Sequence, residues 1–415
     1  AMIHKYSGDL ITPLKRLQHS GHIEIITTSA THAVLPTLSH PEALRAQIAA
    51  AAEDYLDRFN TKASGFWLPE CAYDPRVLSY LKLAGFKYIF TESHSLGASE
   101  AAAKNGVYAS YRAPNGINVF ARDADSSKEV WSAKFGYPGH PAYREFYRDL
   151  GYDADYDYIR PYLGQDGARR PLGFKYHRIT GGGDLSAKKY YDPDEARAVA
   201  ESHAADFLER RMRQADEIHS SRGIRPVITG CYDAELFGHW WFEGPAFLES
   251  MIRKIRQERL PIQLVTPGEY LNSCPEPATL NPGISSWGEN GYFDPWINDS
   301  NDRIYPAVLS VTDMMIETAN HFANQDLTGL TLRALNQAAR EVLLAQSSDW
   351  PFLMYIGSHS RYASERVDEH SSNAARLLTE VLEKRVDEKA LSELEKKNSL
   401  FQRMDFRLFA SVSRF

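Results

Sequence analysis

Two acidic residues of the chain each follow a short apolar run, and this placement suits acid–base chemistry. Glu70 comes soon after residues 66–68, which read as a buried strand that Pro69 ends. Asp233 comes after a second apolar run, residues 224–229. Carboxyl groups at the ends of two different strands could serve as nucleophile and acid/base in the cleavage of a glycosidic bond. Taken alone, Glu70 is equally explained as a solvated cap of the helix that follows it.

Aromatic residues accompany both carboxyl groups in the sequence. Trp67 lies in the first apolar run, and His239, Trp240 and Trp241 follow the second acidic residue. The faces of aromatic rings suit the apolar faces of pyranose rings. Packing in the core of a large barrel explains Trp240 and Trp241 equally well, so both interpretations stay open on these residues alone.

Two long strings of residues carry a resemblance to a known family. They are Phe-Trp-Leu-Pro-Glu-Cys-Ala-Tyr at residues 66–73 and Tyr-Asp-Ala-Glu-Leu-Phe-Gly-His-Trp-Trp at residues 232–241. The chain resembles glycoside hydrolase family 57 and, within it, the 1,4-alpha-glucan branching enzymes, from about Leu17 to near the C-terminus. The resemblance implies Glu70 as the nucleophile and Asp233 as the acid/base of a retaining enzyme, with their carboxyl groups ~5 to 6 Å apart.

Further motifs, in the order of the family, imply residues that bind the glucan. Residues 23–33 resemble the motif that lines the innermost subsite, and Val-Trp-Ser followed by Gly-Tyr-Pro-Gly resembles a substrate-binding segment. A third motif, Ser-Ser-Trp-Gly-Glu together with Asp-Pro-Trp-Ile-Asn, resembles the segment whose tryptophans line the glucan groove. A fourth motif, Ser-Ser-Asp-Trp-Pro-Phe, resembles a further segment that contacts the substrate. The substrate-binding residues implied in this way are His32, Trp67, Arg122, Trp131, Gly139, His239, Trp240, Trp287, Trp296 and Asp349.

A metal centre has to be weighed, because sugar deacetylases and some mannosidases also place Asp and His residues on barrels. His32, His239, Asp233 and Glu235 could be imagined around a zinc ion. The chain has no His-x-x-x-His pair at helical spacing and no cysteine cluster with ligand spacing. We therefore expect neither a metal ion nor another cofactor.

Strands and helices alternate along the first two thirds of the chain, which favours a parallel sheet. The expected strands are residues 22–27, 66–68, 87–91, 117–121, 224–229 and 262–266, and the expected helices are residues 40–59, 76–83, 193–213 and 245–259. The family resemblance implies a distorted (β/α)7-type barrel over residues 1–275, with a helical and loop excursion at about residues 140–190. Long helical patterns predict a helical C-terminal domain over residues 276–415. These patterns are residues 299–324, 330–345, 372–382 and 386–397.

The composition narrows the classes of partner. The chain of 415 residues has a formal net charge of −7, which gives no reason to expect nucleic acid or an anionic membrane as a partner. Its three cysteines make no disulfide framework, and the sequence contains neither a membrane-spanning run nor a signal peptide. The expected location is the cytoplasm, and the expected partner is an alpha-1,4-glucan.

Two features of the chain depart from the family pattern. The first clear strand, residues 22–27, already corresponds to the family's second motif, so the expected barrel lacks its first strand. Three explanations are open: the chain is a fragment, a separate chain supplies that strand, or the groove is open. Branching members also carry a long mobile loop where this chain has a shorter connection, from Ser93 to Gly116.

The predicted activity is that of a 1,4-alpha-glucan branching enzyme, which cleaves alpha-1,4 links and forms alpha-1,6 branches in alpha-glucan metabolism. One alternative is an alpha-1,4-glucan hydrolase or a 4-alpha-glucanotransferase. Another is a glucan-binding protein without catalysis, or one subunit of a split enzyme.

Overall fold

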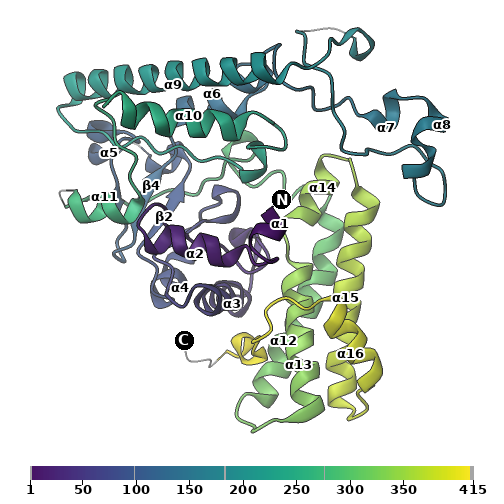
Figure 1. The fold of residues 1–415 in the computed structure, drawn as a ribbon. Helices are drawn as coiled ribbons and strands as arrows, with labels where there is room; N and C mark the ends of the chain where they lie inside the picture. The colour runs from purple at the N-terminus through teal and green to yellow at the C-terminus, as the bar shows by residue number, and fades with distance from the viewer. Residues whose placement is uncertain (1, 98, 182–183, 275, 412–415) are drawn as a thin grey trace. The chain divides into compact units, whose positions relative to one another are not determined.

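The computed structural model describes residues 2–97, 99–181, 184–274 and 276–411. The chain divides into two compact units. The first unit comprises Ala1–Ala121 and Val265–Phe415, and the second comprises Arg122–Leu264. Figure 1 shows the elements of both units, coloured along the chain.

The first unit contains a five-stranded sheet with the strand order β1-β2-β4-β3-β5. Its strands are β1 (Gly65–Phe66), β2 (Tyr88–Thr91), β3 (Tyr111–Arg112), β4 (Asn118–Ala121) and β5 (Ala278–Thr279). β1, β2 and β4 are parallel, as expected for strands joined by helices, while β3 runs antiparallel to β4 and parallel to β5. The strands expected at residues 87–91 and 117–121 are thereby confirmed.

The strand expected at residues 22–27 is wrong as a regular element. It contributes a single bridge, from Thr27 to Phe66. The backbone amide of Ile25 donates a hydrogen bond to the side chain of Gln18 (2.7 Å), so this amide pairs with a side chain and not with a neighbouring strand. β1 likewise stops at Phe66, two residues before the end expected for it.

Residues 224–229 and 262–266, also expected as strands, form no ladder within the described part of the chain. Pro226 lies in the middle of the first segment and has no amide hydrogen to donate to a ladder. The second segment ends at Thr266, whose side chain begins a capping box on helix α11 (Pro267–Ser273). Both segments are irregular connections, and both strand predictions are wrong.

The helix expected at residues 40–59 is confirmed as α3 (Pro41–Phe59). Pro41 occupies its first turn, where the backbone amide has no helical partner to lose, and Asn60 ends it with a left-handed φ of 55°. The alanine-rich side of α3 is buried in the core of the first unit. The other helices before or beside the sheet are α1 (Met2–Lys5), α2 (Ile11–His19), α4 (Val77–Leu83) and α5 (Glu100–Asn105).

Helices also form the C-terminal part of the first unit, as expected, and Figure 1 shows the longer ones side by side in green and yellow. They are α12 (Tyr305–Phe322), α13 (Gly329–Ala345), α14 (Asp349–Tyr355), α15 (Ser360–Leu382) and α16 (Glu388–Lys397). α13 packs along α15, and both helices bury alanines, Ala338 and Ala374 among them, which allows a close approach of the two backbones. α15 begins well before the start expected at residue 372.

The second unit contains two long helices that lie side by side, α9 (Pro193–Arg222) and α10 (Gly244–Gln257) (Figure 1). Asp192 caps the start of α9, and Gly223 ends it in the left-handed conformation at φ 67°. α9 continues beyond the end expected for it because its buried side extends as far as Ile218. The shorter helices of this unit are α6 (Ala124–Trp131), α7 (Leu150–Asp153) and α8 (Tyr156–Ile159).

A buried carboxylate, that of Asp149, connects two parts of the excursion expected at about residues 140–190. The side chain of Asp149 accepts hydrogen bonds from the amides of Gly151 (2.9 Å), Leu172 (2.7 Å) and Gly173 (3.0 Å). Asp149 is 2% exposed, so these amides replace the water that its charge would otherwise need. A single side chain therefore joins two parts of the loop that are distant in the sequence.

The mixed α/β class and the helical C-terminal part agree with the fold expected from the sequence. The domain boundary at about residue 275 stays a prediction. In the described residues, no helix combines the length and the apolar character that crossing a membrane requires.

The histidine His203 on α9 makes the stability of the second unit depend on pH. Its Nδ1 lies 2.8 Å from the hydroxyl of Tyr143, and its ring centroid lies 4.7 Å from that of Tyr137. Burial lowers the pKa of His203 from its ordinary value of 6.5 to about 4. Between these values the unfolded chain takes up a proton that the folded chain does not, so stability falls as the pH drops from about 6.5 towards 4.

At low pH the free energy of unfolding of the wild type falls. We expect His203→Gln to make that fall smaller by about 1 to 2 kcal/mol, after allowance for the partial exposure of the ring. The measurement is urea unfolding of the wild type and the variant at about pH 7.5 and about pH 5. The control is His219→Gln, which changes an exposed histidine on the same helix and should leave the loss unchanged. An equal loss in the wild type and in His203→Gln would contradict the assignment.

Candidate active site

Glu70 lies in a tight turn that follows the short strand β1. It belongs to the 3-10 segment η2 (Pro69–Cys71), where Glu70 has φ 62° and ψ 24° and Cys71 has φ 51°. A left-handed backbone costs a residue with a side chain roughly 1 to 2 kcal/mol. Two such residues in succession therefore need support from the surrounding structure, and backbone strain of this kind concentrates at functional sites.

Residues 285–287 supply that support through the backbone. The amide of Trp287 donates to the carbonyl of Glu70 (3.1 Å), and Tyr73 and Ser285 exchange two backbone hydrogen bonds (2.8 and 3.2 Å). Tyr73 and Ser285 are fully buried. The turn is thus fixed by a segment 217 residues away in the sequence, so tertiary structure sets the direction of the Glu70 side chain.

Two side chains of the first unit orient the carboxylate of Glu70. Nε1 of Trp287 donates a hydrogen bond to its Oε2 (2.7 Å), and Nδ1 of His32 lies 3.7 Å from its Oε1. The side chain of Glu70 is 20% exposed and that of His32 is 40% exposed. A carboxylate that is held in a fixed direction and remains accessible can attack an electrophilic carbon.

His32 also lies in a left-handed turn, with φ 54°. Its Nδ1 lies 2.9 Å from Oγ of Ser348, and its carbonyl accepts a hydrogen bond from the Ser348 amide (3.3 Å). The structure therefore brings His32 and Glu70 together, as the resemblance implies for an innermost subsite. Ser348 was not predicted as a site residue, although it directly precedes Asp349 in the motif that indicated a substrate contact.

Trp67 and Trp287 form an aromatic pair beside Glu70. Their ring centroids lie 5.1 Å apart, and Trp67 also packs against Phe90 of β2 at 6.0 Å. Both tryptophans are partly exposed. Rings of this kind can contact the apolar face of a pyranose.

Trp296 and Asp349 have different surroundings. Trp296 is 2% exposed and belongs to a hydrophobic cluster with Val34 and Ala72, and its carbonyl accepts a hydrogen bond from the hydroxyl of Tyr305. A tryptophan buried to this extent stabilises the core, and its contact with a glucan stays a prediction. Asp349 is exposed as the first residue of α14, and its contact with a glucan stays a prediction as well.

Asp233 lies in the second unit, immediately before the 3-10 segment η7 (Ala234–Leu236). Nε1 of Trp131 donates a hydrogen bond to Oδ2 of Asp233 (3.1 Å). Trp131 is the last residue of α6 and is 61% exposed. The structure therefore brings these two predicted site residues together, with the indole holding one carboxyl oxygen.

Arg122 and Gly139 lie before and after α6. Arg122 is half-buried at the start of the second unit. A Cβ atom at Gly139 would lie 1.7 Å from the carbonyl oxygen of Ala133, so only glycine fits there. This close approach explains the glycine without a sugar, and the binding roles of Arg122 and Gly139 stay predictions.

Trp240 and Trp241 are adjacent in the sequence but have different surroundings. Trp241 is 1% exposed and packs against Phe247 with ring centroids 5.0 Å apart, so the core interpretation holds for it. Trp240 is 50% exposed and stacks on Phe146 at 4.3 Å, and the exposed ring of His239 meets the same phenylalanine at 5.2 Å. Phe146 was not predicted as a site residue, because many aromatic residues surround it in the sequence of the excursion.

No group of three or more His, Cys, Asp or Glu side chains in the described residues is arranged to hold a metal ion. Glu70 belongs to the first unit and Asp233 to the second, so each is described with its own neighbours. The predicted separation of their carboxyl groups stays a prediction.

The motifs around Glu70 and Asp233 can be compared with known families. The model of glycosyl hydrolase family 57 matches residues 1–282. The chain belongs to glycosyl hydrolase family 57. A second model, that of the C-terminal region of 1,4-alpha-glucan branching enzymes, matches residues 308–409. The family expected from the motifs is thereby confirmed.

Curated relatives of this family 57 chain carry branching enzyme names. The chain is 32% identical over 431 residues to the 1,4-alpha-glucan branching enzyme TK1436 of Thermococcus kodakarensis, with 95% of this chain and 60% of the relative covered. It is 30% identical over 368 residues to the probable 1,4-alpha-glucan branching enzyme Rv3031 of Mycobacterium tuberculosis, with 86% and 64% covered. The chain thus spans less than two thirds of the length of these relatives.

Solved structures of an alpha-amylase and of a family 57-type branching enzyme share the fold of this chain. The alpha-amylase AmyC of Thermotoga maritima has a TM-score of 0.91 and 37% identity, with 100% of this chain and 78% of that chain covered. The family 57-type branching enzyme of Pyrococcus horikoshii has a TM-score of 0.87 and 31% identity, with 99% and 76% covered. The expected fold class, an α/β barrel followed by a helical C-terminal part, is confirmed by this likeness.

The left-handed conformation of Glu70 predicts an unusual order of stability among its variants. We expect Glu70→Gly to be more stable than Glu70→Ala by about 1 kcal/mol, because the two differ only in the Cβ atom that disfavours this conformation. The measurement is the free energy of unfolding in urea, which does not depend on enzyme activity.

The matched control is the same pair of substitutions at Glu317, an exposed position inside α12. There the order should be reversed, with alanine more stable than glycine by about 1 kcal/mol. If alanine were the more stable residue at both positions, the left-handed turn at Glu70 would be contradicted.

Proposed function

We propose that the chain carries the catalytic apparatus of a 1,4-alpha-glucan branching enzyme that retains anomeric configuration. The observation that supports this most is the carboxylate of Glu70, which is fixed by Trp287 and lies next to His32 at the end of a barrel strand. The names of the relatives and the match of the C-terminal model to branching enzymes support the choice of reaction.

The proposed reaction is a double displacement. Glu70, ionised, attacks the anomeric carbon, and Asp233 gives a proton to the oxygen of the leaving glucan. The glucosyl ester on Glu70 is then attacked by the 6-hydroxyl of another glucan chain, and Asp233, now a base, takes the proton of that hydroxyl. The products are an alpha-1,6 branch and the free enzyme.

The neighbours of the two carboxyl groups support these roles. The indole of Trp287 donates a hydrogen bond to Oε2 of Glu70, and His32 lies beside Oε1, so the carboxylate of the proposed nucleophile has a defined direction. The indole of Trp131 donates a hydrogen bond to Oδ2 of Asp233 and thereby orients the carboxyl group that would carry the proton. Trp67 adds an aromatic face beside the nucleophile.

Hydrolysis is the second candidate reaction. The solved alpha-amylase that resembles this chain favours it, because the ester on Glu70 can equally be attacked by water. The shorter connection from Ser93 to Gly116 points the same way, since a long loop in that region would help to exclude water. The two candidates share every step up to the ester, and only the acceptor differs.

The wider setting is part of the same proposal. An alpha-1,4-glucan is the proposed partner, alpha-glucan or glycogen synthesis the proposed pathway, and the cytoplasm the proposed location. The small number of cysteines supports that location. A separate chain that supplies a further barrel strand stays a prediction, and co-purification of a small partner would identify it.

The test is incubation of the purified protein with amylose, with the loss of iodine colour and the release of reducing ends followed in parallel. Branching predicts colour loss with few new reducing ends, and hydrolysis predicts that both signals change together. Glu70→Gln and Asp233→Asn should each reduce the colour change by roughly 10³-fold or more.

The control is Glu235→Gln, which changes an exposed carboxylate two residues from Asp233 and should leave the rate within about twofold of the wild type. Glucan binding without any change in either signal would contradict the proposed catalysis. Full activity in Glu70→Gln would contradict the assignment of the nucleophile.

A further inference from the structure

The short helix α6 connects the catalytic carboxyl of the second unit to the long helix α9. Its last residue, Trp131, donates the hydrogen bond that holds Oδ2 of Asp233. Trp131 is largely exposed, so its direction depends on how firmly α6 itself is held. The contacts of α6 therefore bear on the orientation of Asp233.

The segment that leads to Asp233 is bonded to α6 before the indole reaches the carboxyl. The carbonyl of Thr229 accepts a hydrogen bond from the amide of Asp123, the capping residue of α6 (2.9 Å). The hydroxyl of Tyr232 donates to the carbonyl of Ser126 within the helix (3.3 Å). A rotation or shift of α6 would therefore disturb the segment and the indole bond together.

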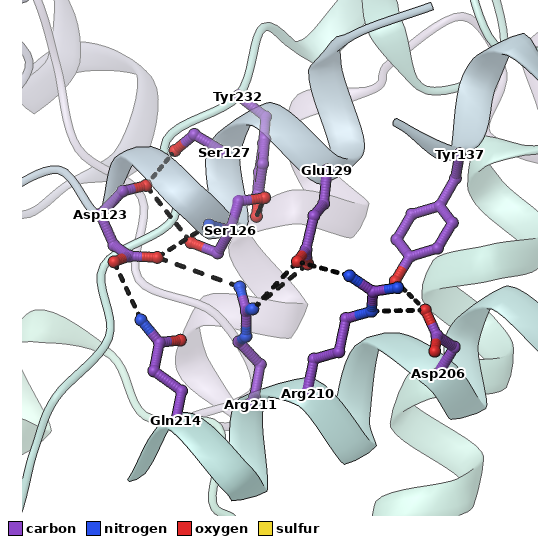
Figure 2. A network of polar contacts seen from close by, with 10 residues as sticks. All are labelled: Asp123, Ser126, Ser127, Glu129, Tyr137, Asp206, Arg210, Arg211, Gln214 and Tyr232. Carbon is purple, nitrogen blue, oxygen red and sulfur yellow. Dashed lines mark hydrogen bonds and ion pairs between the residues drawn. The ribbon is translucent and has the colours of Figure 1, made fainter. Parts of the chain in front are cut away.

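One guanidinium contacts both ends of α6, as Figure 2 shows. Arg211, on α9, lies with its Nη2 3.2 Å from Oε2 of Glu129 in the last turn, and its Nη1 lies 3.9 Å from Oδ2 of Asp123 at the cap. The same Oδ2 accepts the amide of Ser126 (2.8 Å), which is the capping bond of the helix. Arg211 is 6% exposed, and Asp123 is 2% exposed, so these charges interact with little screening.

The next residue on α9 has a different set of contacts. Arg210 bonds to Asp206 (2.8 Å) on its own helix and lies 3.4 Å from Glu129, and the side chain of Arg210 is 47% exposed (Figure 2). Tyr137 donates to the same Asp206 carboxylate (2.7 Å). Arg210 therefore contacts one end of α6 from the surface, whereas Arg211 joins both ends from the interior.

We propose that Arg211 is a positioning residue for Asp233, acting through α6 and the indole of Trp131. The proposal rests on the proposed function for its effect on catalysis, because it takes Asp233 as the acid/base. Without the guanidinium, the carboxylates of Asp123 and Glu129 lose the buried cation that they share. α6 then loses its fixed orientation, and Trp131 loses its direction towards Asp233.

The direct test observes the indole and does not require activity. In protein labelled with ¹⁵N-tryptophan, the Nε1–H resonance of Trp131 is the one that disappears in Trp131→Phe. The part of its pH-dependent shift that the carboxyl of Asp233 causes is the part that disappears in Asp233→Asn. We expect Arg211→Met to reduce the size of that pH response by at least about half. Glu129→Gln keeps the guanidinium and removes one of its two carboxylate partners, so it should also reduce the pH response of the Trp131 resonance. If Arg211→Met does not fold, the result for Glu129→Gln decides whether Arg211 positions Asp233.

The matched control is Arg210→Met, which removes the exposed neighbour and should leave the Trp131 resonance at its wild-type position. A Trp131 resonance with the wild-type position and pH response in both Arg211→Met and Glu129→Gln would overturn the proposal.

A kinetic comparison separates positioning of the acid from a general loss of folded protein. Arg211→Met should lower kcat on a glucan by about 10- to 100-fold, with KM within about threefold, because the leaving sugar needs a proton. On a dinitrophenyl alpha-maltooligoside, whose leaving group needs no proton, the loss should be less than about threefold.

Equal losses on both substrates, with the indole resonance unchanged, would overturn the proposal. If the wild type acts on neither substrate, the proposed function fails, and the indole resonance alone decides whether Arg211 positions Asp233.

Discussion

The hydrogen bonds between residues 70–73 and residues 285–287 are the constraint on which the candidate nucleophile depends. Glu70 and Cys71 both adopt left-handed conformations, which cost roughly 1 to 2 kcal/mol each. Three backbone hydrogen bonds and the indole bond of Trp287 oppose that cost, each contributing about 1 kcal/mol in a largely buried setting. The same bonds bring Trp287 beside the carboxylate, so the support of the turn and the orientation of the side chain have one origin. Loss of this segment would release the backbone strain and the direction of Glu70 together.

In the second unit, charged side chains fix the position of the segment that carries Asp233. Asp233 follows an irregular segment that contains Pro226 and forms no ladder in the described residues, so regular sheet pairing does not fix its position. The segment is held by α6, and α6 is held by Arg211 through a carboxylate at each end. In both units the predicted catalytic carboxyl accepts an indole hydrogen bond on one oxygen. Each indole thereby helps to fix the direction of the carboxyl group.

Local sequence patterns predicted the parts of the fold that local interactions determine. The helix α3 follows from an alanine-rich periodic stretch with proline at its start, and the long C-terminal helices follow from their apolar spacing. The motifs placed Glu70 beside a strand end and Asp233 beside aromatic rings, and the family confirmed from them fixes the fold class. The strands were predicted less well, because the amide of Ile25 pairs with the side chain of Gln18, which no apolar alternation reveals. The left-handed turn at Glu70 and the role of Arg211 depend on contacts between residues far apart in the sequence, and neither leaves a local signal.

In the proposed reaction, the held and accessible carboxylate of Glu70 forms the covalent bond to the sugar. The most direct measurement is to trap the glucosyl ester with a fluorinated alpha-glycosyl fluoride, which forms the ester quickly and releases it slowly, and to locate the sugar by mass spectrometry of tryptic peptides. We expect the sugar on the peptide of residues 63–76, in which Glu70 is the only glutamate. We also expect Glu70→Gln to abolish the label and Asp74→Asn to retain it. A label on any other carboxylate of the chain would contradict the assignment of Glu70 as the nucleophile.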